Sequence, residues 1–190
     1  MQEIKENGKK AGKLLKGERV LLRPPRSSDV DEFIALNEAS VDLHRGLVSA
    51  PVRPQQFQEY LKKSRQSDCE YFLICHKQSR AIIGSINLSQ VTRGLFQNAY
   101  LGYYIGAPFA GQGYMGEAIE VLLRYSFQDL KLHRIEANVQ PHNTASIALL
   151  KRAGFTKEGF SRRYLKICGR WRDHERWAII AEDWRAKKRG

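Results

Sequence analysis

The stretch GQGYMGEAIEVLLRYSFQDL, residues 111–130, joins a glycine-rich turn directly to the pattern of an amphipathic helix. Its first six letters read G-x-G-x-x-G, a pattern found where a turn holds a phosphate group. Closely spaced glycines let backbone N–H groups approach an anion, and the helix that follows presents the positive end of its dipole. The stretch therefore predicts a turn and helix that bind a pyrophosphate. The alternative is a tight strand-to-helix connection without a ligand.

A nicotinamide-dinucleotide site is a poor match to the surroundings of this turn. Such a site needs a strand that runs directly into the first glycine and an acidic residue at the end of the next strand. Here residues 107–110 separate the strand pattern from the glycines, and the next strand pattern ends in Gln140. The remainder of the chain is too short for a doubly wound sheet. No Lys-Ser or Lys-Thr pair follows Gly116, which also excludes a nucleoside-triphosphate P-loop.

The composition is that of one soluble globular domain. The chain has 190 residues, of which 42% are hydrophobic and 27% charged. No apolar run approaches the roughly 20 residues of a membrane span, and the N-terminus lacks the apolar core of a secretory signal. Cys69, Cys75 and Cys168 have no metal-ligand spacing and are expected to stay reduced. We therefore expect a cytoplasmic protein that does not contact a membrane.

The net charge of +12 is concentrated at the two ends of the chain. Residues 1–19 hold six lysines and arginines against three acidic residues, and residues 162–190 hold ten against four. We expect a basic arm at residues 1–17 outside the core, a domain at 18–184 and a basic tail at 185–190. From the charge alone, a surface that only confers solubility is favoured; weak electrostatic contact with the ribosome or RNA is the alternative.

The remaining patterns alternate between strands and helices. Strands are expected at residues 17–25, 70–77, 79–91, 95–108, 133–140, 160–169 and 170–180. Helices are expected at residues 27–40, 54–67, 116–130 and 143–155, with Ser28 as a cap, Pro54 in a first turn and Gly154 just past a helix end. This order predicts a mixed α/β (α+β) fold, in which a mostly antiparallel sheet of about seven strands contains one β-α-β crossover.

Several separated motifs together resemble a known family. GQGYMGEA (111–118) followed by HRIEANVQPHNTASIALLKRAGFTKEGF (133–160) is similar to the acyl-CoA site of the GNAT superfamily of N-acetyltransferases. NAYLGYYI (98–105) and GRWRDH (169–174) are similar to its ribosomal-protein-alanine N-acetyltransferase branch. The resemblance covers roughly residues 18–184 and implies the GNAT fold, with helices flanking the sheet and a splayed strand pair that binds acyl-CoA. Two positions depart from the superfamily pattern, Ala110 in place of Gln or Arg and Met115 in place of Gly or Ala.

The resemblance also implies acetyl-CoA as cosubstrate, without a metal, and a monomer or homodimer. Backbone amides of the turn would hold the pyrophosphate, at Gly111, Gln112, Gly113, Tyr114, Met115 and Gly116. The strand end at Tyr104, Ile105 and Gly106 would pair with pantetheine and offer an amide to the thioester oxygen. For Tyr104 taken alone, a packed aromatic is the favoured interpretation.

Asn143 and Ser146 are the candidate catalytic residues, and both are also expected to contact the cofactor. Asn143 opens the helix after the splayed strand, where an N-cap is its alternative role. Many superfamily members carry a proton-donating tyrosine seven residues later, but this chain has Leu150 there. Ser146 is the available hydroxyl, as general acid or as hydrogen-bond donor to the thiolate, and simple helix surface is the alternative.

The general base stays unassigned. Asn138 occupies the position of a glutamate that some N-terminal acetyltransferases use, and an amide cannot accept the proton. For Glu136 a salt-bridged sheet residue is favoured, and for Glu117 a helix-dipole partner. A strong base is less necessary for a terminal amine, whose pKa is about 7.7–8.0, than for lysine at about 10.4.

Histidines and the GRWRDH motif add two weaker hypotheses. His44, His142 and His174 have no clustered acids or helical partners, so we expect no metal site. Trp171 and Arg172 are candidates for the acceptor side, and an edge strand with a buried tryptophan is the alternative.

Three functions are compatible with these patterns. The favoured one is direct attack of an α-amine, the N-terminal alanine of a ribosomal protein, on acetyl-CoA in a ternary complex. The second has a small amine as acceptor, a polyamine or an aminoglycoside, which would call for an acidic pocket. The third is a ribosome- or RNA-associated protein without turnover.

Overall fold

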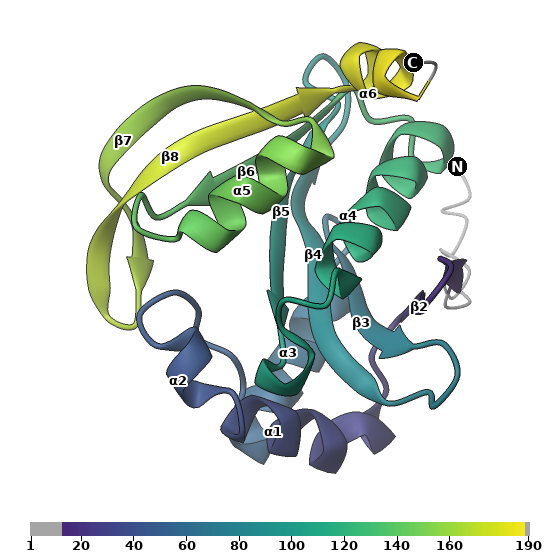
Figure 1. Ribbon diagram of the computed structural model, residues 1–190, viewed down its shortest axis with the longest axis vertical. Coiled ribbons are helices and arrows are strands. Elements are labelled where there is room, and N and C mark those ends of the chain that lie inside the picture. The colour runs from purple at the N-terminus through teal and green to yellow at the C-terminus, as the bar shows by residue number, and fades with distance from the viewer. Residues whose placement is uncertain (1–12, 189–190) are drawn as a thin grey trace, which may run out of the picture.

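A computed structural model describes residues 13–188 and contains an eight-stranded sheet in the order β1-β2-β3-β4-β5-β6-β8-β7 (Figure 1). The strands are β1 Leu15–Lys16, β2 Val20–Arg23, β3 Glu70–His76, β4 Ile82–Thr92, β5 Asn98–Ile105, β6 Arg134–Val139, β7 Thr156–Ile167 and β8 Arg170–Ile180. All neighbours pair antiparallel except β5 and β6, which are parallel. The mixed, mostly antiparallel sheet with one crossover is confirmed.

Helices cover both faces of this sheet. α1 (Val30–Glu38) and α3 (Pro54–Ser64) pack on one face, while α4 (Tyr114–Arg124), α5 (Thr144–Ala153) and α6 (Ala181–Lys187) pack on the other. A single turn of helix, α2 (Val41–His44), lies between α1 and α3 in the chain. Among the described residues, no helix is long and apolar enough to cross a bilayer.

The two hydrophobic cores arise from the alternation of side chains along the strands. In β3, Phe72 and Ile74 point into the larger core under α4 and α5, whereas Leu73 and Cys75 point into the smaller core under α1 and α3. Successive residues of a strand face opposite sides, so a strand that is apolar throughout is buried on both faces. This explains why the segment YFLIC within β3 is an unbroken apolar run.

The parallel pair β5–β6 separates after three residue pairs. Asn98, Ala99 and Tyr100 pair with residues 134–136, after which β5 stays paired only with β4 up to Ile105, and β6 stays paired only with β8 (Figure 1). The second half of β5 therefore has a free edge on the side where β6 has moved away. The predicted splayed strand pair is confirmed.

Both ends of the domain differ from the expectation. Residues 1–17 were expected outside the core, but Leu15 pairs with β2 and is buried, because its leucine side chain fills the larger core. The tail expected at 185–190 begins as part of α6, anchored by the buried Trp184 against Phe127. Residues 1–12 and 189–190 lie outside the described residues.

The helix signals were correct at two of three positions. Pro54 lies in the first turn of α3, and Gly154 adopts a left-handed φ of 95° at the end of α5. Ser28 does not cap α1, because a short 3-10 turn precedes that helix. Asp29 instead accepts a hydrogen bond from the Arg26 N–H at 2.6 Å.

Candidate active site

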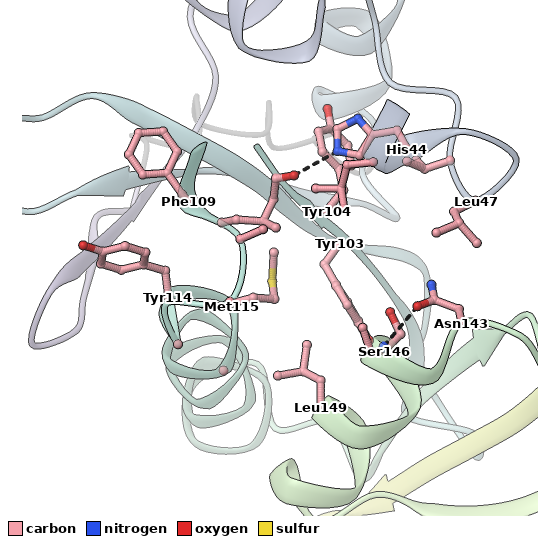
Figure 2. A pocket seen from close by; sticks show the side chains of 18 of the residues that line it. His44, Leu47, Tyr103, Tyr104, Phe109, Tyr114, Met115, Asn143, Ser146 and Leu149 are labelled. Carbon is pink, nitrogen blue, oxygen red and sulfur yellow. Dashed lines mark hydrogen bonds between the residues drawn. The ribbon is translucent and has the colours of Figure 1, made fainter. Parts of the chain in front are cut away.

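One pocket of about 540 Å³ opens where β5 and β6 separate. This volume lies in the range of small-molecule sites. Most of the predicted site residues line it, namely Tyr104, Ile105, Gly111, Gly113, Tyr114, Met115, Gly116, Asn143 and Ser146. Figure 2 shows the side chains of Tyr104, Met115, Asn143 and Ser146 around this space, which come from β5, from the start of α4 and from the start of α5.

The phosphate turn, residues 111–116, has the geometry that the glycines predicted. Gly111 and Gly113 adopt φ values of 74° and 84°, a region that residues with a Cβ rarely visit. Gly113 immediately precedes α4, so the N–H groups of the first helical turn point out of the helix toward the turn. Such a turn can bind an anion through backbone donors alone, so the Ala110 departure removes no donor from it.

Arg19 and Glu117 brace the turn from the side of β2. The Arg19 guanidinium donates to the Gln112 carbonyl at 3.2 Å and lies 4.8 Å from the centre of the Tyr114 ring. Glu117 accepts the backbone N–H groups of Arg19 and Val20 at 2.7 and 3.2 Å. Burial opposes ionisation of Glu117, but these hydrogen bonds outweigh it and lower the pKa of Glu117. Glu117 therefore holds structure together at a helix start and does not point at the pocket as a base.

Asn143 and Ser146 meet at the start of α5. The Asn143 side-chain oxygen accepts the backbone N–H of Ser146 at 3.1 Å, so the N-cap interpretation is confirmed. The Ser146 hydroxyl stays available to the pocket, and the Tyr103 ring points toward it in Figure 2. The buried Tyr103 hydroxyl has no hydrogen-bond partner among the described residues. Burial raises the pKa of Tyr103, and Ser146 partly opposes that rise.

The opposite side of the pocket consists of the α2 wall, defined here as Leu43, His44, Leu47 and Val48. His44 is buried and its Nε2 lies 2.9 Å from the Ile105 carbonyl oxygen, on the free edge of β5 (Figure 2). Tyr104 turns away from Tyr103 and packs edge-on against the His44 ring, with 5.1 Å between the ring centres. Both interpretations of Tyr104 are compatible with this placement, since it is a packed aromatic and also lines the pocket.

The two sheet residues weighed as bases do not line the pocket. Glu136 accepts a hydrogen bond from Arg134 Nε at 2.9 Å, and Arg134 also pairs with Glu158. The salt-bridged alternative is therefore confirmed for Glu136. Asn138 lies two residues further along the same face of β6.

Some candidates lie outside the pocket lining. Gly106 donates its N–H to the Ile83 carbonyl at 2.8 Å, and Gln112 donates its side chain to the Pro108 carbonyl at 2.8 Å. Trp171 and Arg172 lie near the tip of the β7–β8 hairpin, where Trp171 is 61% exposed. The buried-tryptophan alternative is therefore wrong for Trp171, because β8 buries Trp177 instead. The roles of these four candidates stay predictions.

The other two histidines lie apart from His44. His142 is exposed, and His174 is buried on β8 with Nδ1 3.0 Å from the Arg172 carbonyl oxygen. Burial lowers the pKa of His174. Within residues 13–188 no group of three or more His, Cys, Asp or Glu side chains is arranged to hold a metal ion.

Sequence reasoning missed the α2 wall and part of the cofactor side. The additional lining residues are Leu43, His44, Leu47, Val48, Tyr103, Phe109, Ala145, Leu149 and Arg152. Of these, His44 enters the sequence analysis only as a possible metal ligand. Tyr103 could have been found, because it neighbours Tyr104 on the predicted strand end. Residues 41–48 carry no motif or periodicity that separates them from an ordinary loop.

Comparisons with known proteins agree on one family. A family model described as an acetyltransferase (GNAT) domain matches residues 19–156. The probable N-acetyltransferase YjcK of Bacillus subtilis (strain 168) is 33% identical over 178 residues, covering 90% of this chain and 98% of the relative. The [ribosomal protein uS5]-alanine N-acetyltransferase of Escherichia coli (strain K12) is 44% identical over 120 residues, covering 63% of this chain and 62% of that relative.

Solved structures give the same result. RimJ of Mycobacterium smegmatis, determined in complex with CoA-disulfide, is 28% identical with a TM-score of 0.81, covering 90% of this chain and 87% of that one. The ribosomal-protein-S5-alanine acetyltransferase of Vibrio fischeri is 27% identical with a TM-score of 0.78, covering 90% of this chain and 98% of that one.

Proposed function

Because the chain belongs to the GNAT acetyltransferase family and is an N-acetyltransferase, we propose that it moves an acetyl group from acetyl-CoA to the α-amine of a protein N-terminus, an N-terminal alanine of a ribosomal protein. One observation carries the proposal. The free edge of β5 and the phosphate turn open into one pocket, so a long cofactor with a pyrophosphate at one end can bind along both.

The residues present fit acetyl-CoA. When bound, it supplies an activated acetyl group on a thioester. The phosphate turn offers backbone N–H groups without a side chain in the way, because Gly111 and Gly113 have no Cβ. The β5 edge beyond Tyr100 offers backbone groups without a strand partner to an extended amide-containing arm, apart from the Ile105 carbonyl, which His44 Nε2 contacts. An N–H on this edge would stabilise the negative charge that develops on the thioester oxygen.

Ser146 and Asn143 would act at the sulfur end of the site. The Ser146 hydroxyl faces the pocket and would donate a hydrogen bond to the departing thiolate. Asn143 holds the start of α5 through the Ser146 N–H, which fixes the position of that hydroxyl. Because a terminal α-amine has a pKa of about 7.7–8.0, much of it is already neutral at physiological pH and ready to attack.

The acceptor assignment rests on the comparisons and on the lining of the pocket. The relative from Escherichia coli, named for an alanine of ribosomal protein uS5, shares 44% identity over its matched stretch. A spermidine N(1)-acetyltransferase of Vibrio cholerae is 26% identical over 125 residues. Among the described residues that line the pocket there is no Asp or Glu, whereas a polycation would need acidic partners. The lining therefore favours the peptide terminus over a polyamine.

The test is acetyl transfer measured by mass spectrometry with a panel of acceptors. The panel contains peptides that start with Ala, Ser or Met, deacetylated ribosomal proteins, spermidine and an aminoglycoside. We expect the mass of one acetyl group to be added at the Ala-starting terminus. Labelling confined to the small amines would keep the cofactor and overturn the proposed acceptor. CoA binding and salt-dependent RNA binding are measured beside it, because RNA binding without CoA binding would indicate a protein without turnover.

A further inference from the structure

The outer part of the β7–β8 hairpin carries free positive charge. Residues 160–172, called the outer hairpin here, contain five lysines and arginines and no Asp or Glu. Four of the five are exposed and one is half-buried; they are Arg162, Arg163, Lys166, Arg170 and Arg172. Among residues 13–188, none of these five side chains forms an ion pair. The outer hairpin therefore presents a positive surface that the described residues do not neutralise.

The carboxylates nearest to the outer hairpin on β8 have other partners. Glu175 Oε1 lies 2.5 Å from Lys157 Nζ at the base of the hairpin. Asp173 accepts the backbone N–H of Arg163 at 2.7 Å. Surface charge of one sign repels itself and attracts ions of the opposite sign from solution. The cations of the outer hairpin are therefore free to contact an anionic partner.

Aromatic side chains are exposed among these cations. Trp171 is 61% exposed, Phe160 49% and Tyr164 37%, whereas the other two tryptophans are buried in the larger core. Neither Phe160 nor Trp171 belongs to a hydrophobic core of the described residues. An exposed ring contributes little to the stability of the fold, because its apolar surface stays in water. These rings are therefore available to a partner that has flat, apolar faces.

The strand register places two of the rings and one cation on the same face. Trp171 lies opposite Lys166, and Phe160 lies opposite Glu175. Cross-strand partners share a face, and so do positions 171 and 175, which are an even number of residues apart on one strand. Phe160 and Trp171 are therefore about 13 Å apart along one face, with Lys166 beside Trp171. Figure 1 shows this hairpin bending away from the sheet toward α2.

Single strands of nucleic acid match this arrangement of cations and rings. Proteins that bind such strands combine positive charge along the phosphate backbone with aromatic side chains on which successive bases stack. A duplex does not offer its base faces to a ring, because they are already stacked on one another. An acidic protein would contact the cations but would not require the exposed rings. The combination therefore favours an unpaired strand.

We propose that the outer hairpin binds a single-stranded segment of RNA. Bases stack on Trp171 and Phe160, and the phosphates lie near the free cations. The choice of RNA over DNA rests on the proposed function, because a ribosomal particle presents the N-termini of its proteins next to RNA. Cys168 Sγ, at the tip, lies 3.4 Å from Ser49 Oγ in the loop after the α2 wall. RNA on the outer hairpin would therefore hold the enzyme with its pocket near an acceptor on the same particle.

The first test measures the salt dependence of RNA binding by fluorescence anisotropy, with a labelled oligouridylate of about 12 nucleotides. We expect a Kd of about 10⁻⁴ to 10⁻⁶ M near physiological salt. The triple variant Arg162→Gln/Lys166→Gln/Arg170→Gln should bind more weakly. The slope of log K against log salt should become shallower by about 2, since each phosphate contact of a single strand contributes about 0.7 to it.

The matched control removes the same charge from a different surface. Lys62, Lys63 and Arg65 are exposed at the end of α3, and substitution of all three by glutamine should change the slope by less than about 0.5. If the two triple variants lost the same slope, RNA binding would depend on the net charge alone. That result, or a wild-type protein that binds no RNA, overturns the proposal.

The second test is Trp171→Ala, which removes a ring but no charge. One base stacked on an aromatic side chain changes affinity about 5- to 150-fold, so the Kd of the oligouridylate should rise at least about fivefold while the salt slope stays the same. Phe96→Ala is the matched control, since Phe96 is 72% exposed in the β4–β5 turn. An unchanged Kd in Trp171→Ala contradicts base stacking and with it the proposal.

Other probes decide which class of partner the outer hairpin binds. We expect wild type to bind the oligouridylate at least about fivefold more tightly than polyglutamate or an RNA duplex of the same length, because neither can stack on the rings. Equal or tighter binding of polyglutamate would indicate an acidic protein, and tighter binding of single-stranded DNA would indicate DNA; each overturns the proposal. Wild type should also sediment with purified ribosomes, and the outer-hairpin triple variant should not.

RNA binding is measured without acetyl-CoA or acceptor, which separates this proposal from the proposed function. If the wild type acetylates the Ala-starting peptide and binds no RNA, the acceptor stands and the outer-hairpin proposal is wrong. If it binds RNA through the outer hairpin and acetylates only spermidine, the RNA surface stands and the peptide acceptor is wrong. If it neither binds RNA nor acetylates an amine, both fail.

Discussion

The phosphate turn and the α2 wall line the same pocket, yet they keep their shapes by different means. The conformation of the turn is set mainly by its own backbone, through positive φ values at Gly111 and Gly113 and the start of α4, and Arg19 braces it at the Gln112 carbonyl. The α2 wall consists of the end of the single-turn helix α2 and the loop after it, and it is held by other parts of the chain. The Ala107 N–H donates to Ser40 Oγ at 2.8 Å, and Gln140 donates to the Gly46 carbonyl at 2.7 Å.

This difference separates two tasks within one site. A local backbone motif can be kept intact while the remainder of the chain varies, which suits a cofactor that every member of a family uses. A short segment held by side chains from elsewhere can change shape when any of those side chains changes, which suits an acceptor that differs between members. Substitutions on the two sides should therefore affect different kinetic constants.

Gly113→Val should have the largest effect and should act on the cofactor. The position has a left-handed φ, which costs a branched residue about 1–2 kcal/mol of conformational free energy. The Cβ of the valine would also lie 3.1 Å from Arg19 Nη2. We expect the Kd of CoA to rise about 10- to 100-fold in a calorimetric titration. Gly94→Val is the control, since Gly94 has a φ of 69° and open space around its Cβ position. If the Kd of CoA rose equally in both variants, backbone strain alone would explain the weaker binding, and crowding of the turn would not.

Ser146→Ala should lower kcat about tenfold without weakening CoA binding. Alanine removes the hydroxyl but keeps the backbone N–H that Asn143 accepts, so the start of α5 is retained. Steady-state kinetics beside calorimetry distinguish the two effects, with exposed Ser67→Ala as the control. If kcat were unchanged, a group other than Ser146 would donate the hydrogen bond to the thiolate. Tyr103 would then be the next residue to substitute.

Leu47→Ala should affect the acceptor alone. Truncating this side chain of the α2 wall removes about 1 kcal/mol of apolar contact with a bound peptide, so its KM should rise about fivefold. The Kd of CoA should stay the same. Leu95→Ala is a matched control, because Leu95 is fully exposed in the β4–β5 turn. A rise in the Kd of CoA instead would place the cofactor, not the acceptor, against α2.

Glu117→Gln should have the smallest effect on the reaction, because it acts on the stability of the fold. The pKa of Glu117 is lowered in the folded state, so its carboxylate stabilises the fold above the ordinary glutamate pKa of about 4.3 and loses that contribution as the pH falls further. In urea titrations the variant should lose about 1–2 kcal/mol at pH 7, and the difference should shrink toward pH 3. Glu59 is exposed, so Glu59→Gln should not change the free energy of unfolding in this way. If the stability difference between Glu117→Gln and wild type did not depend on pH, the ionic explanation would be contradicted.

The fold was largely predictable because its signals are local. The apolar runs of β3 and β4, the Gly154 cap and the crossover around residues 111–130 all lie in contiguous sequence. β1 and α6 were missed because Leu15 and Trp184 stand among lysines and arginines, where charge suggested solvated ends. Their burial depends on cores built by distant residues.

The site was predictable on the cofactor side for the same reason. The glycines and Asn143 carry conformational requirements that can be read from neighbouring letters. His44 carries none, since its partner Ile105 lies 61 positions away, and only the folded chain brings the two together. Trp171 is the reverse case, because its motif suggested a role in the site but its side chain is exposed at a hairpin tip.

The tip of the β7–β8 hairpin reaches the loop that follows the α2 wall, where Cys168 Sγ lies 3.4 Å from Ser49 Oγ. Cys168 Sγ also contacts the carbonyl of Val48, so the α2 wall, which we propose faces the acceptor, touches a hairpin about 120 residues further along the chain. For protein engineering this has a practical meaning. To transfer acceptor selectivity to another protein of this fold, both segments would have to be transferred together. The loop alone would lack the hairpin surface that it packs against.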